Sequence, residues 1–360
     1  MKKIKIAHIS SVHAHDDIRI FHKECKTLSK KYEVHLLNKD FNGTIDGVIF
    51  HKVPFLKKKI LRVFSSWFFA LKETSFKGFK VIHFHDPELL FATPFWKLTG
   101  KKVIYDVHEN YVKQISTRKT IPTIIRFLIK ICIIITEFFF SLFTDLIIVV
   151  IDNLNARLDI LNKSITIGNY PIVKYKFIDK PRKKQFVYIG KLSEDRGILK
   201  VAKILNIKNI HFIIAGNFSS ENFKKQILSY PNVKYLGVIG RAKIEEIVSE
   251  SIGGFCTLFP TPNHLNSSTN KFFEYLAFGT PVVASNFKKW TEFIPKKNNF
   301  VFYVNPLSDN EIERAVEFIV ECNSSKINKL GYEGHKYVKL KFNWDIQGEK
   351  LIGAYKLLIN

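Results

Sequence analysis

Short apolar runs alternate with longer amphipathic segments along both halves of the chain. In the first half the apolar runs fall at residues 5–9, 34–37, 48–52, 81–84, 103–105 and 146–151. In the second half they fall at 186–189, 211–215, 233–236, 254–258 and 282–284. Helices are predicted at about 17–30, 270–277 and 344–358. Short apolar runs separated by helices are typical of strands buried on both faces of a parallel sheet. The pattern therefore predicts an α/β protein.

The restart of this pattern after the middle of the chain predicts two domains. The 360 residues are enough for two separate cores. A stretch near 168–184 contains prolines and charges and shows little periodicity, as expected of a linker. We therefore expect Rossmann-like domains at 1–168 and 169–343, followed by an amphipathic helix within 344–360.

Two stretches of the first half raise the question of a membrane. Residues 121–143 are apolar and about long enough to span a bilayer, but they contain Arg126, Lys130 and Glu137. At helical spacing these charges fall in one narrow sector, so we predict a helix packed inside the domain and no membrane span. Residues 57–72 interleave basic and aromatic side chains, as interfacial anchors do.

The charge and the cysteines narrow the class of protein. The formal net charge is +24 at pH 7. No nucleic-acid-binding motif accompanies it, so anionic lipid or a polyphosphate ligand is the better functional explanation. A biased composition without function is the alternative. The four cysteines form no CxxC pair, and no signal peptide is visible, which favours a reducing cytoplasm.

Polar loops follow three of the predicted strands in the first half. Ligands of such sheets bind at the carboxyl ends of the strands, so these loops are candidates for a site. No G-x-G-x-x-G is present, which weighs against a dehydrogenase. A metal site of the histidines remains open, but no two of them show the helical i, i+4 spacing of ligands near a third ligand, so we expect none. The candidate side chains are His13, Asp16, Asp17, Arg19, Asp86, His108 and Glu109.

In the second half, two segments suit a sugar nucleotide. Gly190 allows a tight turn between a strand and a helix, and Lys191 and Arg196 place positive charges next to this turn. Near the predicted helix 270–277, hydroxyls precede Lys271, and Glu274 lies one turn further on. The free N–H groups of a helix start favour anions, so a diphosphate is expected there and ribose hydroxyls on the carboxylate. An ordinary capped helix with solvated charges would show the same residues.

The segment NKFFEYLAFGTPVVAS resembles the donor-nucleotide segment of GT-B glycosyltransferases, specifically the retaining family-four group. RIFHKEC, HFHDPELL, YDVHENY and the turn after Gly190 are similar to other parts of the same group, so the resemblance covers nearly the whole chain. Its Glu-x7-Glu motif places the second, ribose-associated Glu on Glu274. The first, associated with the donor sugar, falls on Asn266. The family's Arg and Lys at the diphosphate correspond to Lys191 and Arg196, with the two residue types exchanged.

The resemblance implies two Rossmann-like domains facing a cleft, with the last helix packing back on the first domain. It implies transfer of a sugar, with retention, from a UDP- or GDP-linked donor to a saccharide or lipid-linked acceptor in cell-surface polysaccharide synthesis, without a cofactor or essential metal. The expected catalytic residues are His108, Lys191 and Arg196, and the expected donor-binding residues are Gly190, Asn266, Ser268, Thr269, Lys271 and Glu274.

Two other classes of protein remain open. One is a sugar-nucleotide epimerase or a phosphorylase of the same fold. The other is a non-catalytic basic protein that binds membrane or nucleic acid. We expect no nucleic-acid partner, a cytoplasmic protein, and peripheral contact with the inner face of an anionic cell membrane.

Overall fold

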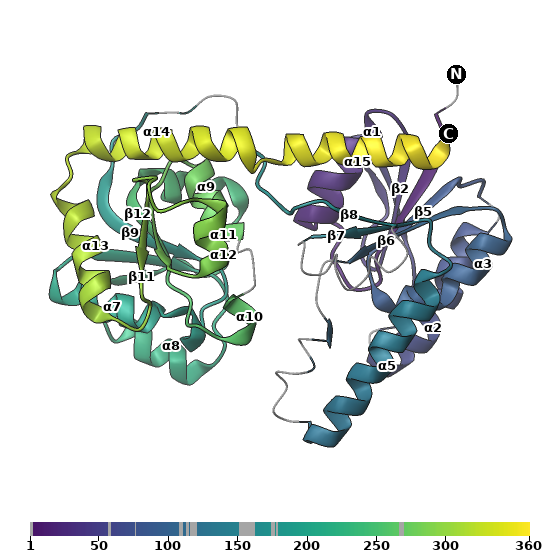
Figure 1. Ribbon diagram of the computed structural model, residues 1–360, viewed down its shortest axis with the longest axis horizontal. Helices are drawn as coiled ribbons and strands as arrows, with labels where there is room; N and C mark the ends of the chain where they lie inside the picture. Colours follow the sequence, from purple (N-terminus) through teal and green to yellow (C-terminus); the bar gives the residue numbers. More distant parts are fainter. Residues whose placement is uncertain are drawn as a thin grey trace. The chain divides into compact units, whose positions relative to one another are not determined.

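The chain forms two compact units in the computed structural model (Figure 1). The structure describes residues 3–56, 59–75, 77–107, 111–112, 115, 121–150, 163–173, 177, 179–265 and 270–360. Unit 1 consists of Met1–Asn169 and Trp344–Asn360, and unit 2 consists of Tyr170–Asn343. The boundary after Asn169 lies one residue beyond the predicted end of the first domain, and the boundary before Trp344 coincides with the predicted start of the last helix.

Unit 1 is built on an eight-stranded sheet in the order β3-β4-β2-β1-β5-β6-β7-β8. All neighbours are parallel except β3, which pairs antiparallel with β4. Strand β1 is central, so the order reverses between β1 and β5, and polar residues after these two strands share one edge. The strands are β1 (Lys5–Ile9), β2 (Glu33–Asn38), β3 (Gly43–Ile45), β4 (Val48–Lys52), β5 (Val81–Phe84), β6 (Lys102–Val107), β7 (Leu146–Val149) and β8 (Ser164–Thr166).

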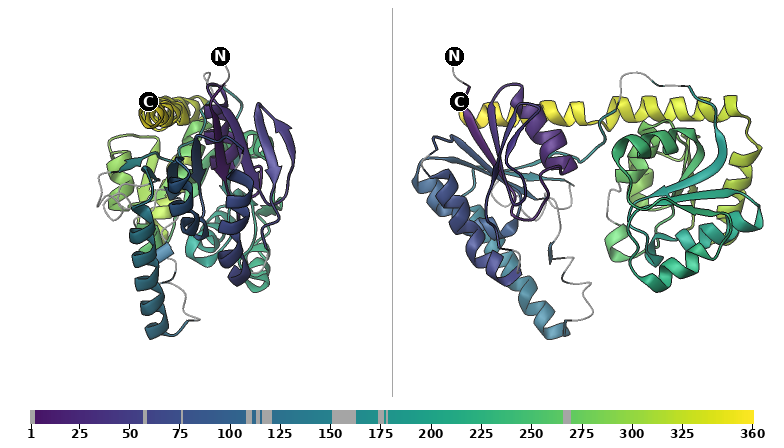
Figure 2. Two further views of the ribbon diagram at one scale, coloured as in Figure 1. Left: turned by 90° about the vertical axis from the view of Figure 1, so that its right-hand side faces the viewer. Right: turned by 180° about the vertical axis from the view of Figure 1, so that it is seen from behind.

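Helices cover both faces of this sheet, as Figure 2 shows from two further sides. One hydrophobic cluster joins the sheet to α2 (Lys59–Thr74), η2 (Pro87–Ala92) and α3 (Thr93–Leu98). The other joins it to η1 (Ile18–Cys25), α1 (Lys26–Ser29) and the last helix, α15 (Trp344–Ile359). Because both faces are buried, the strands are apolar on both sides, which is why their runs are continuous in the sequence.

The helix expected at 17–30 begins with two turns of π-helix, η1, before α1 continues it. Asp17 caps the start, because its side chain accepts hydrogen bonds from the N–H groups of Arg19 (2.8 Å) and Ile20 (2.9 Å). In a π-helix the hydrogen bonds join residues five apart. Arg19 and Glu24 therefore come to the same side, where Arg19 Nε lies 3.0 Å from Glu24 Oε1.

Residues 121–143 contain the predicted helix, but the prediction that this helix is packed inside the domain is wrong. The helix exists as α5 (Thr123–Ser141), but most of its apolar side chains are exposed. Glu137 and Ser141 are its buried residues. The polar sector turns toward the rest of unit 1 and the apolar sector turns away from it. No helix among the described residues combines the length and the hydropathy needed to cross a bilayer.

Unit 2 has a six-stranded parallel sheet in the order β11-β10-β9-β12-β13-β14. Here too the first strand is central, and the order reverses between β9 and β12, as in Rossmann folds. The parallel α/β architecture predicted from the sequence is confirmed in both units. The strands are β9 (Lys183–Ile189), β10 (His211–Ala215), β11 (Val233–Tyr235), β12 (Ser251–Cys256), β13 (Val282–Ser285) and β14 (Val301–Val304).

The helices of unit 2 pack in two clusters, one on each face of the sheet. The first face carries α7 (Ile198–Ile207), α8 (Glu221–Leu228) and α13 (Asp309–Glu321), and the single turn η4 (Glu194–Arg196) precedes α7. The second carries α9 (Arg241–Glu250), α11 (Asn270–Ala277), α12 (Lys288–Phe293) and α14 (Ser324–Lys341), with the short α10 (Pro262–Leu265) before α11.

Candidate functional site

The candidate donor site of unit 2 lies where the strand order reverses. Chain segments after β9 and β12 meet there, and α7 and α11 start near it from opposite faces of the sheet. Tyr275 of α11 fixes this arrangement, because its hydroxyl accepts a hydrogen bond of 2.8 Å from the N–H of Ile189, the last residue of β9. The Tyr275 ring also packs on Gly254 of β12, where a Cβ would come within 2.5 Å of the ring. Reversal points of this kind are where α/β sheets bind ligands.

The turn after β9 has room only for glycine. Gly190 has a φ of +132°, and its N–H donates to Ala215 O at 2.8 Å. A Cβ on Gly190 would lie 2.1 Å from Lys271 Cε. Gly190 therefore does more than permit the turn, because it leaves space for the lysine of α11 to reach across the strand end.

Lys271 is held close to the sheet. Its Nζ donates to Tyr188 Oη at 3.1 Å and lies 4.8 Å from the centroid of the Tyr188 ring. Burial lowers the pKa of Lys271 to about 8, and the positive charge of Arg196 acts in the same direction. The two predicted diphosphate cations are thus near enough to repel each other, and an anion between them would be favoured.

The two carboxylates near these cations already have partners. Asp195 Oδ2 lies 3.3 Å from His264 Nε2, and the hydrogen bond with His264 holds the pKa of Asp195 well below its usual range. Glu274 Oε1 lies 3.4 Å from a guanidinium nitrogen of Arg241 at the start of α9. Glu274 thus sits on the same helix as Lys271, as the sequence predicts, and remains partly exposed, so it can be reached by a ligand hydroxyl.

The structure describes some of the residues predicted for the donor site, and others lie outside the described ranges. Gly190, Arg196, Lys271 and Glu274 come together at this site, and Lys191 lies exposed on the turn after Gly190. Asn266, Ser268 and Thr269 lie outside the described residues.

Sequence reasoning missed four residues of this site. Arg241 starts a helix remote in sequence, Tyr188 looks like any strand residue, and the Asp195–His264 pair joins η4 to α10. The placement of all four is tertiary and leaves no local signal.

In unit 1, the loops after β1 and β5 meet around Asp86. The buried carboxylate of Asp86 accepts hydrogen bonds from the N–H of Ser11 (2.7 Å) and from Ser10 Oγ (2.9 Å), and His13 Nδ1 lies 3.4 Å away. Burial would raise the pKa of Asp86, but the hydrogen bond and charge of His13 and the bonds from the two serines outweigh it and lower the pKa to about 2. Asp86 is therefore an anchored anion at the reversal point of this sheet.

The other acceptor-side candidates divide into structural and exposed residues. Asp17 caps η1, Asp16 is exposed, and Arg19 is buried. His108 and Glu109 lie outside the described residues.

A buried polar network surrounds Arg19 beneath α15. Its guanidinium donates hydrogen bonds of 3.0 and 3.2 Å to Asp106, and its Nε lies 3.0 Å from Glu24 Oε1 in an ion pair. Burial, and then the charge of Asp106, raises the pKa of Glu24 well above its usual range, and burial lowers that of His83 to about 4. Tyr355 of α15 completes the network, with its hydroxyl 2.8 Å from His83 Nδ1.

The ligand atoms of His8, Glu24, His83 and His85 lie within 4.8 Å of one another, close enough in principle for a metal ion. However, the Arg19 guanidinium already occupies the cation position next to the carboxylates. We interpret the cluster as a network that attaches α15 to the sheet.

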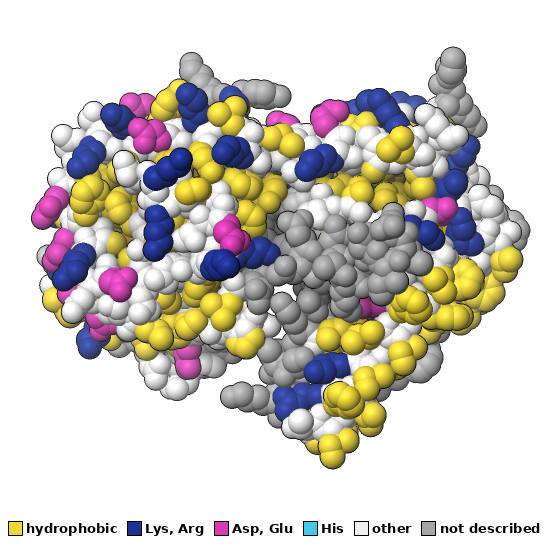
Figure 3. Space-filling view, in the orientation of Figure 1, with side chains coloured by type: hydrophobic (Ala, Val, Ile, Leu, Met, Phe, Trp, Pro, Cys, Tyr) yellow, Lys and Arg dark blue, Asp and Glu magenta, His cyan; other side chains and the backbone are white. Residues whose placement is uncertain are grey.

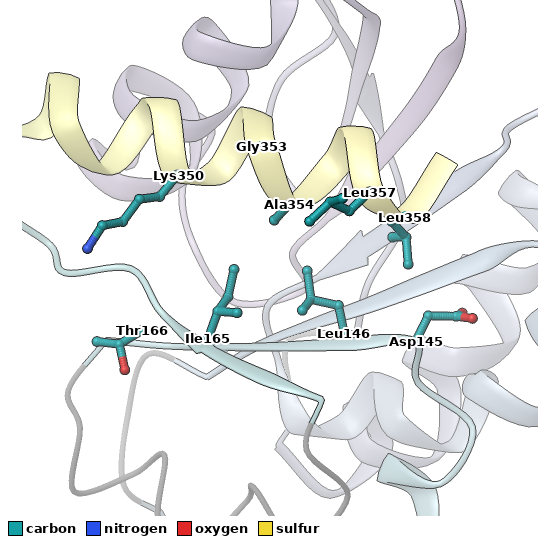
Figure 4. A pocket seen from close by; sticks show the side chains of 9 residues that line it. All are labelled: Asp145, Leu146, Ile165, Thr166, Lys350, Gly353, Ala354, Leu357 and Leu358. Atoms are coloured by element: carbon teal, nitrogen blue, oxygen red, sulfur yellow. The ribbon is translucent and has the colours of Figure 1, made fainter. Parts of the chain in front are cut away.

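An apolar pocket of about 490 Å³ opens under another part of α15 (Figure 4). Side chains of α15 and of β7 and β8 point toward one another across it, among them Leu146, Ile165 and Leu358. Asp145 at its edge is held by Lys97, with its Oδ1 2.7 Å from Lys97 Nζ. The pocket has no pair of cations like that of unit 2, so it does not fit a nucleotide diphosphate.

Comparisons with known proteins bear on unit 2 and on the fold of the chain. Residues 174–337, nearly all of unit 2, match the family model of glycosyl transferases group 1. None of the curated proteins matches the sequence. Among solved structures, the chain is similar to sucrose-phosphate synthase from Thermosynechococcus elongatus, with a TM-score of 0.75, 14% identity and 99% of each chain covered.

Two further solved structures are similar over nearly their full length. A glycosyltransferase from Rickettsia africae has a TM-score of 0.69 at 12% identity, with 100% of each chain covered. HepE (Alr3699) of Anabaena, in complex with UDP and glucose, has a TM-score of 0.67 at 13% identity, with 98% of this chain and 99% of that chain covered. The GT-B fold expected from the sequence is confirmed, and residues 174–337 of the second unit match the model of glycosyl transferases group 1.

Proposed function

We propose that the protein transfers a sugar from a UDP- or GDP-linked donor to a saccharide or lipid-linked saccharide acceptor, with retention of anomeric configuration. Its place would be the synthesis of cell-surface polysaccharide, in the cytoplasm at the inner face of the membrane. We expect the reaction to need no cofactor and no resident metal. Retention and the family-four assignment rest on the sequence resemblance around Glu274.

One observation carries the proposal. At the reversal point of the unit 2 sheet, Lys271 is near enough to Arg196 for the charge of Arg196 to lower the pKa of Lys271, and the carboxylate of Glu274 follows one helical turn behind Lys271. The cations suit the diphosphate of a nucleotide sugar, and the carboxylate suits the ribose hydroxyls. This spacing of two charges and one carboxylate is not required for the stability of the fold, because burial disfavours the charged form of Lys271.

The chemistry follows from where charge develops. When the bond between the sugar and the diphosphate breaks, negative charge grows on the leaving diphosphate, and fixed cations stabilise it more than they stabilise the bound donor. Arg196 and Lys271 would supply this effect, assisted by Lys191 on the turn. In unit 1, Asp86 and His13 are the proposed acceptor-side groups, and His108 is the proposed catalytic residue of this unit.

Screening of donors tests the proposal. The protein would be incubated with UDP- and GDP-linked sugars, with and without oligosaccharide or lipid-linked acceptors, and both released nucleotide and product linkage would be measured. Acceptor-dependent release with an α-linked product from an α-linked donor is expected. Conversion of the donor sugar without an acceptor would indicate an epimerase, and binding without any turnover would refute the enzymatic proposal.

A matched pair of variants separates the site from general charge. Arg196→Ala should lower turnover by about 100- to 1,000-fold, the range found for removal of a group that stabilises developing charge. Lys203→Ala removes an exposed cation from α7, the helix that follows Arg196, and should leave turnover unchanged. An equal loss in both variants would mean that the net charge, and no specific site, governs activity.

A further inference from the structure

Helix α5 of unit 1 carries its apolar side chains on the outside. Every exposed position between residues 124 and 142 is Ile, Leu, Phe or Cys. The three charged residues of the helix lie on its other side, Arg126 and Lys130 half-buried and Glu137 buried. This is the reverse of a surface helix, which turns its charged face to water. The exposed residues are Ile124, Ile125, Phe127, Leu128, Ile131, Cys132, Ile134, Ile135, Phe138, Phe139 and Leu142.

Neighbouring elements of unit 1 extend this apolar surface. Phe91 of η2 is exposed and meets the ring of Phe140 of α5 at a centroid distance of 4.9 Å. Phe95 and Leu98 of α3 are exposed beside it. Figure 3 shows the result as a continuous hydrophobic band along this side of unit 1. We call the exposed residues of α5 together with Phe91, Phe95 and Leu98 the α5 surface.

The size of the α5 surface sets it apart from ordinary exposed apolar residues. If a fully exposed Ile, Leu or Phe offers roughly 150–200 Å² of side chain, the α5 residues alone present on the order of 900 Å². The largest apolar patch of a typical monomeric protein is roughly 300–600 Å² and is often functional. A surface of this size in water is costly unless something covers it.

The chemistry of the α5 surface fits lipid better than protein. A protein interface combines its apolar core with a polar rim and about one hydrogen bond per 100–200 Å². The exposed positions of α5 between 124 and 142 offer no side chain that forms strong hydrogen bonds. Lipid tails need none. The only carboxylate of α5, Glu137, is buried, so no acidic group of this helix would face anionic headgroups.

We infer that the α5 surface docks unit 1 on an anionic membrane, with α5 lying in the plane of the interface. The net charge of +24 draws the protein to anionic lipid. The 19 residues of α5 give a helix about 28 Å long. Its polar inner side prevents it from crossing the bilayer, as is typical of interfacial helices. The inference identifies the membrane surface for the proposed lipid-linked acceptor but does not depend on that acceptor.

Vesicle binding by the full chain tests this inference. Wild type would be sedimented with phosphatidylcholine vesicles, with or without about 30% phosphatidylglycerol, at low salt and at about 0.5 M NaCl, where exposed charges are screened. We expect tighter binding to the anionic vesicles and residual binding at high salt, because burial of apolar surface is not screened. Complete loss of binding at high salt would indicate an electrostatic attachment only and would overturn the inference.

Two double variants with similar exposure isolate the surface. Leu128→Glu with Ile135→Glu changes side chains of α5 that are 58% and 61% exposed. Ile207→Glu with Leu340→Glu changes side chains of unit 2 that are 67% and 64% exposed. Both add the same charge. We expect the α5 variant to bind vesicles at least about 100-fold more weakly and the unit 2 variant to be within about threefold of wild type. Equal weakening would refute the role of α5.

Cys132 provides a direct readout of insertion. It is exposed on α5, Cys25 and Cys256 are buried, and Cys322→Ser would remove the remaining accessible thiol. An environment-sensitive fluorophore on Cys132 should shift to the blue with vesicles and be quenched by spin-labelled acyl chains. If the α5 surface were instead a dimer interface, wild type would be dimeric and the α5 variant would be monomeric. The fluorophore would then not be quenched by spin-labelled lipid. Nucleotide binding, measured separately, should be the same in all variants, so loss of the membrane inference would leave the proposed function standing.

Discussion

Replacement of Lys271 by Met should make the protein more stable and its donor binding weaker. The ordinary pKa of a lysine, 10.5, falls to about 8 for Lys271, mainly through burial. Below pH 8 the folded protein therefore carries a charge that its surroundings disfavour. A difference of 2.5 pKa units corresponds to about 3 kcal/mol at neutral pH. Met has a similar length and no charge, and Tyr188 keeps its own hydrogen bond of 3.0 Å to Lys191 O.

The sign of the effect depends on pH in a defined way. Between about pH 8 and 10.5 the unfolded chain binds a proton at Lys271 that the folded protein has lost, so the stability of wild type rises with pH across this window. Below pH 8 Lys271 is protonated in both states, so the full destabilisation from burying its charge is present. Lys271→Met should therefore raise the free energy of unfolding by about 1–3 kcal/mol at pH 7 and by little above pH 10. Denaturant titrations at the two pH values measure this difference.

Donor binding should change in the opposite direction. A bound diphosphate favours the charged form of Lys271, so binding to wild type takes up a proton above pH 8, and affinity should fall by up to tenfold per pH unit there. Titration calorimetry with a nucleotide sugar from about pH 7 to about pH 9.5 would follow this profile. Lys271→Arg stays charged throughout and should show a flat profile. If Lys271→Met kept the wild-type profile and affinity, the lysine would not contact the diphosphate.

Further changes test the rest of the site and its support. Glu274→Ala should weaken nucleotide binding by about 1.5–3 kcal/mol in calorimetry, and unchanged affinity in the folded variant would remove the ribose assignment. Gly190→Ala should displace Lys271 and weaken donor binding more than nucleoside binding, because its Cβ would lie 2.1 Å from Lys271 Cε. Tyr355→Phe should lower stability by about 1–3 kcal/mol without affecting nucleotide binding, since a buried histidine nitrogen loses its 2.8 Å partner. Asp86, with its pKa lowered from 3.8 to about 2, should contribute about 2 kcal/mol above pH 4 that is lost as the pH falls to about 2, and Asp86→Asn should flatten this part of the acid-unfolding curve.

The sequence was sufficient to predict the strands that are buried on both faces. β1 and β5 are buried along almost their whole length and are mostly apolar, and both have the predicted bounds. β4 also has the predicted bounds, although only Val48 and Phe50 of it are buried. The strands that were missed are mostly short or exposed. β3 and β8 contain three residues each and no fully buried one, so their sequences resemble loops. β14, VFYV, is an apolar run that the same reasoning should have found.

Periodicity located the polar sector of α5 but did not determine which side of the helix faces the protein. A helix with charges in one sector usually buries the other sector. In α5 the charged sector packs inward, and only the contacts of Glu137 and of the neighbouring η2 reveal it. The same limit applies to Arg19. Its partner Glu24 is five residues away, but Asp106 lies on another strand, so no local pattern distinguishes this structural arginine from a ligand-binding one.

The charge balance of each cluster separates a structural role from a binding role. In the network of unit 1, Arg19 is opposed by Asp106 and Glu24, and burial raises the pKa of Glu24 well above its usual range, so the charge of the arginine is compensated within the network. In unit 2, Arg196 and Lys271 are near enough for the charge of Arg196 to lower the pKa of Lys271. Asp195 pairs with His264 and lies 4.0 Å from Arg196, and Glu274 pairs with Arg241. The positive charge there exceeds the negative charge, and it lies at a half-exposed reversal point of the sheet. A folded protein gains nothing from such an imbalance by itself, because like charges repel and burial opposes the ammonium. The imbalance is explained if a ligand with a compensating negative charge binds there, and a nucleotide diphosphate supplies that charge.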